Sequence, residues 1–257
     1  MSKTDFTDRY TSDKDEKLLL RRLSDLLSSS ERSYTTVYSA FLDPAQISLA
    51  AGVREFGGMI DFVGGYDGAE RCLARLRANE YCEEVEPPIV LITARATDKS
   101  AVISHRDVLG ALMGLGIKRE MVGDILPNGN APQFFCHRSV SEHILLTLDK
   151  ISRYSAVLTV SDRAELCEPE YGIKEVNVSS MRLDCIAAEA FSLSRTKAAE
   201  QIKKGQVFVN WKEQTDPSFE LKTGDKLSMR GKGKTEVGEL KGTSKKGRLF
   251  IELLKRI

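Results

Sequence analysis

The sequence predicts an α+β fold of three modules: a helical α/β region over residues 1–87, a central sheet domain over residues 88–172, and a domain of two helices plus a β-hairpin over residues 173–257. Three observations lead to this prediction. Helix-type and strand-type patterns alternate along the chain. Pro87 and Pro88 interrupt the pattern once, and the segment EPEYG at residues 168–172 interrupts it again. The length of 257 residues, 41% of them hydrophobic, is sufficient for two or three small cores.

The first module begins with two helices that carry their own start signals. Ser12 and Asp13 are cap candidates for a helix over residues 13–30, and Asp43 before Pro44 marks a second helix that reaches about Arg54. A short strand is expected over residues 59–63, between two pairs of glycines. The segment GAERCLARLRA, residues 68–78, is expected to be a third helix. Leucines recur at helical spacing in the first helix: Leu19, Leu23, Leu26 and Leu27.

The central module has the pattern β-α-β-β-α-β. Strands are expected over residues 89–94, 121–126, 133–137 and 156–161, and helices over residues 105–116 and 139–151. This order is typical of ferredoxin-like and RRM-like domains, whose four-stranded sheet leaves one face free. An RRM stacks RNA bases on aromatic side chains of that face, but only Phe134 and Phe135 lie nearby here. We therefore expect these two side chains, or at least the inward one, in the core.

The third module combines helices and strands over a short distance. Strands are expected over residues 174–178, 206–211, 223–230 and 248–254. Two helices are expected between the first two of these strands, over residues 181–191 and 194–205. Ser194 is the cap of the second helix, and Gly205 ends it.

Positive charge is concentrated in the carboxyl-terminal third of the chain. The formal net charge is only +1, but residues 181–257 contain 17 basic and 10 acidic side chains. Residues 230–248 contain seven basic and two acidic side chains among five glycines. This composition is typical of mobile loops or strands beside a polyanion, and a solvated basic tail is the alternative.

The second helix of the pair carries cations at both ends. Lys203 and Lys204 lie at the carboxyl end, where cations compensate the helix macrodipole. Arg195 and Lys197 lie at the amino end and add to a positive pole that suits a phosphate group. With the following hairpin and TGDKL, this segment resembles the S4 domain, an RNA-binding module. The matching positions are Arg182, Leu183, Asp184, Ser194, Arg195, Lys197, Ala198, Ile202, Gly205, Val207, Val209, Asn210, Gly224 and Asp225.

The S4 resemblance implies which side chains contact RNA. Asp184 is expected to pair with a basic neighbour within the protein, and Trp211 either stacks on a base or covers the hairpin. The candidate RNA-binding residues are Arg182, Ser194, Arg195, Lys197, Lys203, Lys204, Asn210, Trp211, Lys212, Arg230 and Lys232.

A longer resemblance covers nearly the whole chain. The segments FLDPAQISLA (residues 41–50), GGYDGAER (64–71) and HRDVLGALMGLGIKREMVGDI (105–125), upstream of an S4 domain, are similar to the bacterial YlmH family, whose genes lie near cell-division genes. The resemblance implies a central RRM-like RNA-binding domain and association with ribosomal or transfer RNA. Family members are linked to cell division and to rescue of obstructed large ribosomal subunits, and a photosystem-associated branch exists.

An RNA-modifying enzyme that uses its S4 domain to deliver substrate is one alternative. An adaptor for the division machinery, with the acidic residues 1–180 as its docking surface, is another. The string RLD at residues 182–184 imitates the catalytic motif of pseudouridine synthases, but it lies inside the S4 helix. GGYDGAER does not provide the cofactor loop of a methyltransferase. HRD at residues 105–107 lacks the other kinase motifs, so Ser104 or Asp107 is expected to cap that helix. We expect no catalysis, no metal and no cofactor.

The remaining features favour a cytoplasmic protein without a membrane partner. No apolar run approaches the ~18 to 20 residues that a membrane span needs, and the first residues lack the pattern of a secretory signal. The five cysteines are odd in number and include no CxxC pair, so we expect reduced, structural thiols. They are Cys72, Cys82, Cys136, Cys167 and Cys185.

Overall fold

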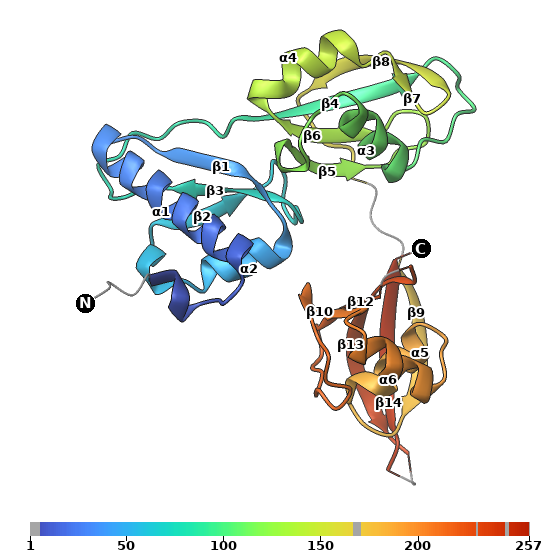
Figure 1. Cartoon of the computed structure of the whole chain (residues 1–257). Coiled ribbons are helices and arrows are strands. Elements are labelled where there is room, and N and C mark those ends of the chain that lie inside the picture. The colour runs from blue at the N-terminus through green and yellow to red at the C-terminus, as the bar shows by residue number, and fades with distance from the viewer. Residues whose placement is uncertain (1–5, 167–170, 230, 245–246, 257) are drawn as a thin grey trace. The chain divides into compact units, whose positions relative to one another are not determined.

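The computed structural model describes residues 6–166, 171–229, 231–244 and 247–256 (Figure 1). The chain divides into two compact units, residues 1–167 (unit 1) and 168–257 (unit 2). Unit 1 contains a three-stranded and a five-stranded sheet, and unit 2 contains a six-stranded sheet. This mixture of helices and largely antiparallel sheets confirms the predicted α+β class.

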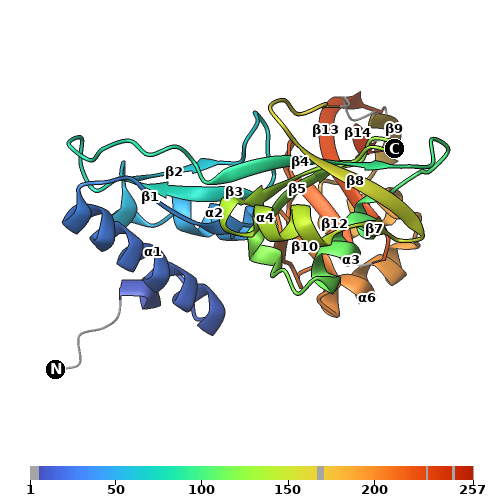
Figure 2. The ribbon, with the colours of Figure 1, turned by 90° about the horizontal axis from the view of Figure 1, so that it is seen from above.

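The three-stranded sheet has the order β1-β3-β2, formed by β1 (Val37–Leu42), β3 (Cys72–Leu76) and β2 (Ile60–Val63). Helices α1 (Lys14–Ser33) and α2 (Pro44–Ala51) lie on one side of it (Figure 2). Short 3-10 turns precede α1 (η1, Phe6–Arg9) and follow α2 (η2, Arg54–Phe56). Leu20 and Leu23 of α1 pack with Ala50 of α2 and Leu76 of β3 in one buried cluster.

Both predicted helix starts are confirmed. The Asp13 carboxylate accepts hydrogen bonds from the backbone N–H groups of Asp15 and Glu16. Asp43 accepts from Gln46 N–H at 2.9 Å, and the Gln46 side chain accepts from Asp43 N–H, also at 2.9 Å. These bonds satisfy amide groups that have no partner inside the helix.

The helix predicted over residues 68–78 is wrong. The second half of this segment is β3, the central strand of the first sheet, and β1 was not predicted at all. Its alanine, leucine and arginine residues favour a helix locally. However, Leu73 and Leu76 point to opposite faces and are both fully buried, each in a different cluster. Burial on both faces of a strand therefore outweighs local propensity here.

The five-stranded sheet confirms the predicted β-α-β-β-α-β order. Its strands are β4 (Ile89–Ala96), β5 (Val122–Leu126), β6 (Gln133–His137), β7 (Lys150–Ile151) and β8 (Tyr154–Ser161), in the antiparallel order β5-β6-β4-β8-β7. Helices α3 (His105–Gly114) and α4 (Arg138–Thr147) supply Leu112 and Ile144 to the same core as Ile92 and Phe134. A 3-10 turn, η3 (Arg119–Met121), leads into β5. The second predicted helix ends earlier than expected, because residues 150–151 form β7.

The other face of this sheet is not free along its whole length. Phe135 is 2% exposed and packs with Leu91, Phe41 and Leu73, so the first module covers this half of the face. The Tyr66 ring stacks on Phe135 with ring centroids 5.3 Å apart. Both phenylalanines predicted to be core residues are therefore buried, but on opposite faces.

Unit 2 contains the two predicted helices and the four predicted strands, together with two further strands. Its sheet has the order β11-β10-β12-β13-β14-β9. The strands are β9 (Tyr171–Val178), β10 (Val207–Val209), β11 (Lys212–Glu213), β12 (Lys226–Met229), β13 (Gly233–Thr243) and β14 (Leu249–Arg256). Helices α5 (Leu183–Ala190) and α6 (Arg195–Lys203) share a core with it through Ile186, Ile202 and Leu227. Much of the basic segment over residues 230–248 is thus a strand rather than a loop.

The cysteines and helices carry two further findings. Cys72, Cys82, Cys136 and Cys185 are buried free thiols, and Cys167 lies outside the described residues. Within the described ranges, no helix is both long and apolar enough to cross a bilayer.

We expect Gly65→Ala to destabilise the chain more than Gly68→Ala does. Both glycines have a positive φ, +93° and +85°, so alanine is strained at either position. Only at Gly65 would the new Cβ meet a ring atom, Phe135 Cε1, at 2.6 Å. We expect losses in the free energy of unfolding of about 2 to 4 kcal/mol for Gly65→Ala and about 1 kcal/mol for Gly68→Ala, measured by urea unfolding. Equal losses would contradict the described packing of Gly65 on Phe135.

Candidate nucleic-acid interface

The starts of α5 and α6 are joined through one carboxylate. Asp184 lies in the first turn of α5 and accepts hydrogen bonds from Arg182 Nε at 3.1 Å and from Arg195 Nη2 at 3.1 Å. Further bonds from Arg182 Nη2 and Arg195 Nε complete two forked contacts. The structure thus brings two of the candidate residues together and agrees with the expected internal role of Asp184.

The shared carboxylate leaves a surplus of positive charge. The Asp184 side chain is only 10% exposed, whereas the Arg182 and Arg195 side chains are 41% and 55% exposed. One negative charge faces two guanidinium groups, so a net positive charge stays at the surface. Both arginines are held in position by Asp184 rather than left fully free for a ligand.

The hydrogen bonds also govern the ionisation of Asp184. Burial raises the pKa of this carboxyl group, but hydrogen bonds from Arg182 and Arg195 outweigh burial and hold its pKa below the ordinary value of 3.8. Asp184 is therefore charged at neutral pH and contributes to stability there.

The start of α6 carries a second exposed cation. Ser194 caps the helix, and its Oγ accepts from Lys197 N–H at 3.3 Å. The side chain of Lys197 is exposed and forms no ion pair with a residue of the described ranges. Lys197 and Lys232, from the turn between β12 and β13, line a surface hollow of about 300 Å³. The remaining lining residues are Leu193, Glu200, Gln201 and Met229.

Lys203 and Lys204 lie at the opposite end of the same helix. Both side chains are exposed, and neither has an ion-pair partner in the part of the chain that the structure describes. Their position suits compensation of the helix dipole, as the sequence indicates. They are separated from the cluster around Asp184 by the length of α6.

Asn210 and Trp211 form the turn between β10 and β11. Their φ values are +48° and +64°, as a two-residue type I′ hairpin turn requires. The Asn210 amide donates to Asp225 Oδ1 at 2.8 Å and accepts from Lys226 N–H at 2.9 Å. Both polar ends of Asn210 are therefore used inside the protein, and its position is explained without RNA.

Trp211 has an intramolecular neighbour that the sequence analysis missed. The Nζ of Lys226 lies over its indole ring, 5.3 Å from the centroid. Spacing alone could not reveal this pair, because it depends on the register of β10 and β12. Lys212, on β11 next to the turn, is exposed, and Arg230 lies outside the described residues.

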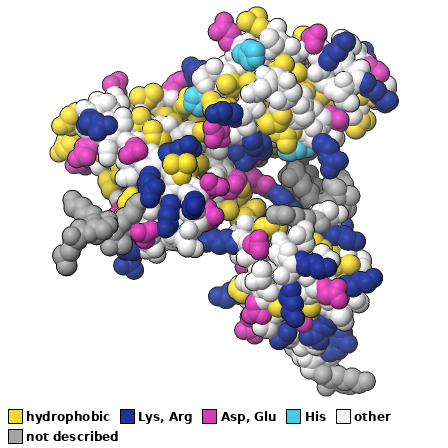
Figure 3. Space-filling model, viewed as in Figure 1, with side chains coloured by type: hydrophobic (Ala, Val, Ile, Leu, Met, Phe, Trp, Pro, Cys, Tyr) yellow, Lys and Arg dark blue, Asp and Glu magenta, His cyan; other side chains and the backbone are white. Residues whose placement is uncertain are grey.

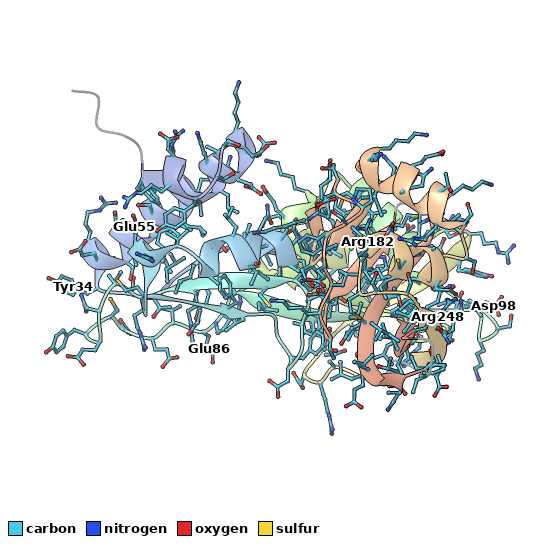
Figure 4. The ribbon with its side chains drawn as sticks, turned by 90° about the horizontal axis from the view of Figure 1, so that it is seen from below. Tyr34, Glu55, Glu86, Asp98, Arg182 and Arg248 are labelled. Carbon is cyan, nitrogen blue, oxygen red and sulfur yellow. The ribbon has the colours of Figure 1, made fainter. Side chains whose placement is uncertain are left out.

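Basic residues are spread over the face of unit 2 seen in Figure 3. Not all of them are available to a ligand. Arg248, just before β14 (Figure 4), donates through Nε to Asn177 Oδ1 and through Nη2 to Asn177 O, both at 2.6 Å. The cations at the helix starts, Arg182, Arg195 and Lys197, together with Lys232, which lines the same hollow as Lys197, are here called the helix-start patch.

The residues that resemble catalytic motifs have structural roles. Asp184 of RLD is held by two arginines, as described above. Asp107 of HRD forms a capping box with Ser104 at the start of α3, which confirms the expected cap. Among the described residues, no group of three His, Cys, Asp or Glu side chains could hold a metal ion.

Comparison with known proteins finds family models and relatives that are similar to this chain. One family model, described as "Putative RNA-binding domain in YlmH", matches residues 83–165, and the S4 domain model matches residues 181–227. A curated relative from Bacillus subtilis (strain 168), "Ribosome-associated protein quality control protein P2", is 33% identical over 240 residues, covering 91% of this chain and 92% of the relative. A solved structure, "Cell division protein ylmH from Streptococcus pneumoniae", is 19% identical with a TM-score of 0.48, covering 59% of this chain and 93% of the other.

We expect Asp184→Asn to destabilise unit 2 in a pH-dependent way. At pH 7 the variant should lose about 1 to 2 kcal/mol, because two charge-assisted contacts are weakened. The pKa of Asp184 is lower in the folded than in the unfolded chain, so its contribution is present above the unfolded pKa and is lost as the pH falls through the folded one. The difference from the native chain should therefore be fully present at neutral pH and shrink once the pH falls below the ordinary carboxyl pKa of 3.8.

Urea unfolding followed by Trp211 fluorescence measures this effect, because the only tryptophan of the chain lies in unit 2. Glu175→Gln, an exposed position on β9, is the matched control and should leave stability nearly unchanged. A difference that stays constant down to the lowest pH would show that the Asp184 charge does not hold the helix starts together.

Proposed function

The chain belongs to the YlmH family, and on that premise we propose that it binds ribosomal RNA, and transfer RNA on the ribosome, without catalysing a reaction. The B. subtilis relative carries a name that places it in ribosome-associated quality control. We carry this setting over to the chain, with the large ribosomal subunit as the proposed partner and the cytoplasm as the location. The link to cell division stays a prediction of the family resemblance.

The helix-start patch is the observation that carries the proposal. Arg182 and Arg195 are held at the starts of two adjacent helices, and they exceed the charge of Asp184 by one. Lys197 and Lys232 add two exposed cations beside a hollow on the same unit. Fixed, exposed cations at helix starts suit the phosphate groups of a folded RNA.

The patch favours recognition of shape and charge over sequence. Guanidinium groups can donate two parallel hydrogen bonds to one phosphate, and Asp184 orients them before RNA arrives. Orientation in advance lowers the entropy cost of binding. Asn210 is engaged internally and Trp211 carries Lys226 on its ring, so neither is needed for this mode of binding.

The central domain adds a second proposed contact. Half of its sheet face is covered around Phe135, but the other half is open at Arg95 and Val157, which are paired across β4 and β8. These two residues, with Lys99 and Asn130, line a cavity of about 460 Å³. Without aromatic side chains there, we expect phosphate contacts from Arg95 and Lys99 and no base stacking.

Neutralising the start of α6 should weaken RNA binding. We expect the double variant Arg195→Gln, Lys197→Gln to lower affinity for ribosomes at least tenfold and to reduce the slope of log affinity against log salt by about 1 to 2. Glutamine is preferred to glutamate, because a carboxylate at position 195 would face Asp184 and could unfold the unit. Filter binding and ribosome co-sedimentation across a salt series measure both quantities.

Lys174→Gln with Lys255→Gln is the matched control. Both lysines are exposed in the same unit, on β9 and β14, at the opposite edge of the sheet from β10 and β11. This pair should change affinity only slightly. The proposed interface is wrong if the α6 variant retains native affinity at moderate salt while its Trp211 unfolding curve is also native.

The enzymatic alternative makes a different prediction. Purified protein incubated with ribosomal RNA should introduce no modified nucleotide that mass spectrometry can detect. A new modification would replace the non-catalytic proposal, even if the helix-start patch binds RNA as expected.

A further inference from the structure

A cavity of about 640 Å³ in unit 1 is lined by four cationic side chains. It lies against α1, the end of β1 and η3, far along the chain from the helix-start patch. Leucines of α1 form an apolar wall. The four cations are Arg22, Arg71, Lys118 and Arg119.

Arg71 and Arg119 are half-buried and bond only to backbone carbonyl groups. Arg71 donates to Val122 O at 3.0 Å, to Phe41 O at 3.1 Å and to Arg119 O at 3.4 Å. Arg119 donates through Nη1 to Val122 O at 2.6 Å and to Gly123 O at 3.2 Å. Neither guanidinium forms an ion pair with a residue of the described ranges. Their charges are therefore oriented but not neutralised by direct contact.

The neighbouring carboxylates are engaged elsewhere. Asp124 accepts from Tyr66 Oη at 2.8 Å and from the backbone N–H groups of Glu70 and Arg71, at 2.7 and 3.1 Å. Asp43 is the cap of α2. Both act on the two arginines only through space. Two further carboxylates lie on exposed residues of the lining, Asp15 and Glu120.

Burial disfavours the charged form of both arginines. Burial lowers the pKa of Arg119, the nearby charge of Arg71 lowers it further, and the pKa falls to about 10. Burial also lowers the pKa of Arg71. Both groups still carry their charge at neutral pH. An anion between them would remove the repulsion and recover part of the desolvation cost.

The three sequence segments that resemble the YlmH family meet at this cavity. Phe41 and Asp43 come from residues 41–50, Arg71 from residues 64–71, and Lys118 and Arg119 from residues 105–125. These segments are separated by many residues in the chain. The fold therefore assembles the cavity from all three.

We propose that this cavity binds a phosphate group, presented either by an RNA backbone or by a free nucleotide. Arg71 Nη1 and Arg119 Nη2 make no hydrogen bond to a described residue, so each guanidinium keeps donors for phosphate oxygens. Lys118 and Arg22 add charge at the exposed side, and the leucines of α1 suit a sugar or base edge. The site lies in unit 1 and does not depend on the helix-start patch.

Direct binding is tested by NMR on the full chain. Inorganic phosphate, 5′-AMP and a single-stranded RNA dodecamer are added in separate titrations while the Nε–Hε signals of Arg71, Arg119 and Arg75 are followed. We expect saturable shifts for Arg71 and Arg119 and none for Arg75, which is paired with Asp61 at 2.6 Å. A response to the dodecamer alone identifies RNA backbone, and a response to 5′-AMP or phosphate identifies a small ligand. No response of either arginine to any probe at millimolar concentration overturns the proposal.

A thermal unfolding experiment separates ligand binding from a structural role. With whichever of the three probes shifts the arginine signals present at ten times its Kd, the midpoint of the native chain should rise by about 4 °C. Arg119→Gln keeps a donor for Val122 O but removes the charge, so it should abolish this rise without lowering the midpoint in phosphate-free buffer. Arg75→Gln, which loses a paired arginine on β3, should lower the midpoint and leave the rise intact. If Arg119→Gln lowers the midpoint and keeps the rise, Arg119 is structural and the site is rejected.

Discussion

The Asp184 carboxylate joins the starts of α5 and α6 through hydrogen bonds from Arg182 and Arg195. Two arginines at neighbouring helix starts repel each other and also face the positive ends of the helix dipoles. One buried carboxylate, hydrogen-bonded to both, makes this arrangement stable while leaving positive charge at the surface. The same contact thus serves stability and the proposed recognition of RNA. Removing it would disturb both.

The repulsion between neighbouring arginines is compensated in different ways in the two arginine pairs described above. Arg182 and Arg195 share a carboxylate and lie near the surface. Arg71 and Arg119 are more buried and are oriented only by carbonyl groups. In the first pair, Asp184 contacts both guanidinium groups directly. In the second pair, the carboxylates of Asp43 and Asp124 act on the guanidinium groups only through space. This difference is the physical reason to assign a bound anion to the second pair and a transient RNA contact to the first.

Local signals made much of the fold predictable. Asp13, Asp43 and Ser194 start their helices as expected, because a cap is a short-range interaction that the sequence shows directly. The β-α-β-β-α-β order could also be predicted, because helices and strands differ in the spacing of their apolar residues. Strand β3 could not be predicted, because its residues favour a helix locally and burial on both faces of the strand outweighs this preference. The strand expected over residues 248–254 is found as β14, whereas β13 was not expected. The pairing of β14 with β9 joins segments that are distant in the sequence.

The candidate site was only partly predictable, for the same reason. The cations at the start of α6 follow from helix spacing, but the Lys226–Trp211 contact and the Arg71–Arg119 pair join residues from distant segments. The Asn210 side chain is engaged within the protein because of the geometry of its turn, in which two consecutive residues have a positive φ. The sequence alone does not show this turn geometry. The sequence therefore identifies the candidate side chains, but only the tertiary structure shows which of them are already engaged within the protein.

The Tyr66–Phe135 stack has a practical consequence for dividing the chain. Pro87 and Pro88 look like a natural place to cut, but a fragment that starts there would leave Phe135 and Leu91 facing water. Such a fragment would expose an apolar patch on its sheet, and we expect it to self-associate. Expression of the central domain should therefore retain the first module, or replace both side chains with polar ones of similar size.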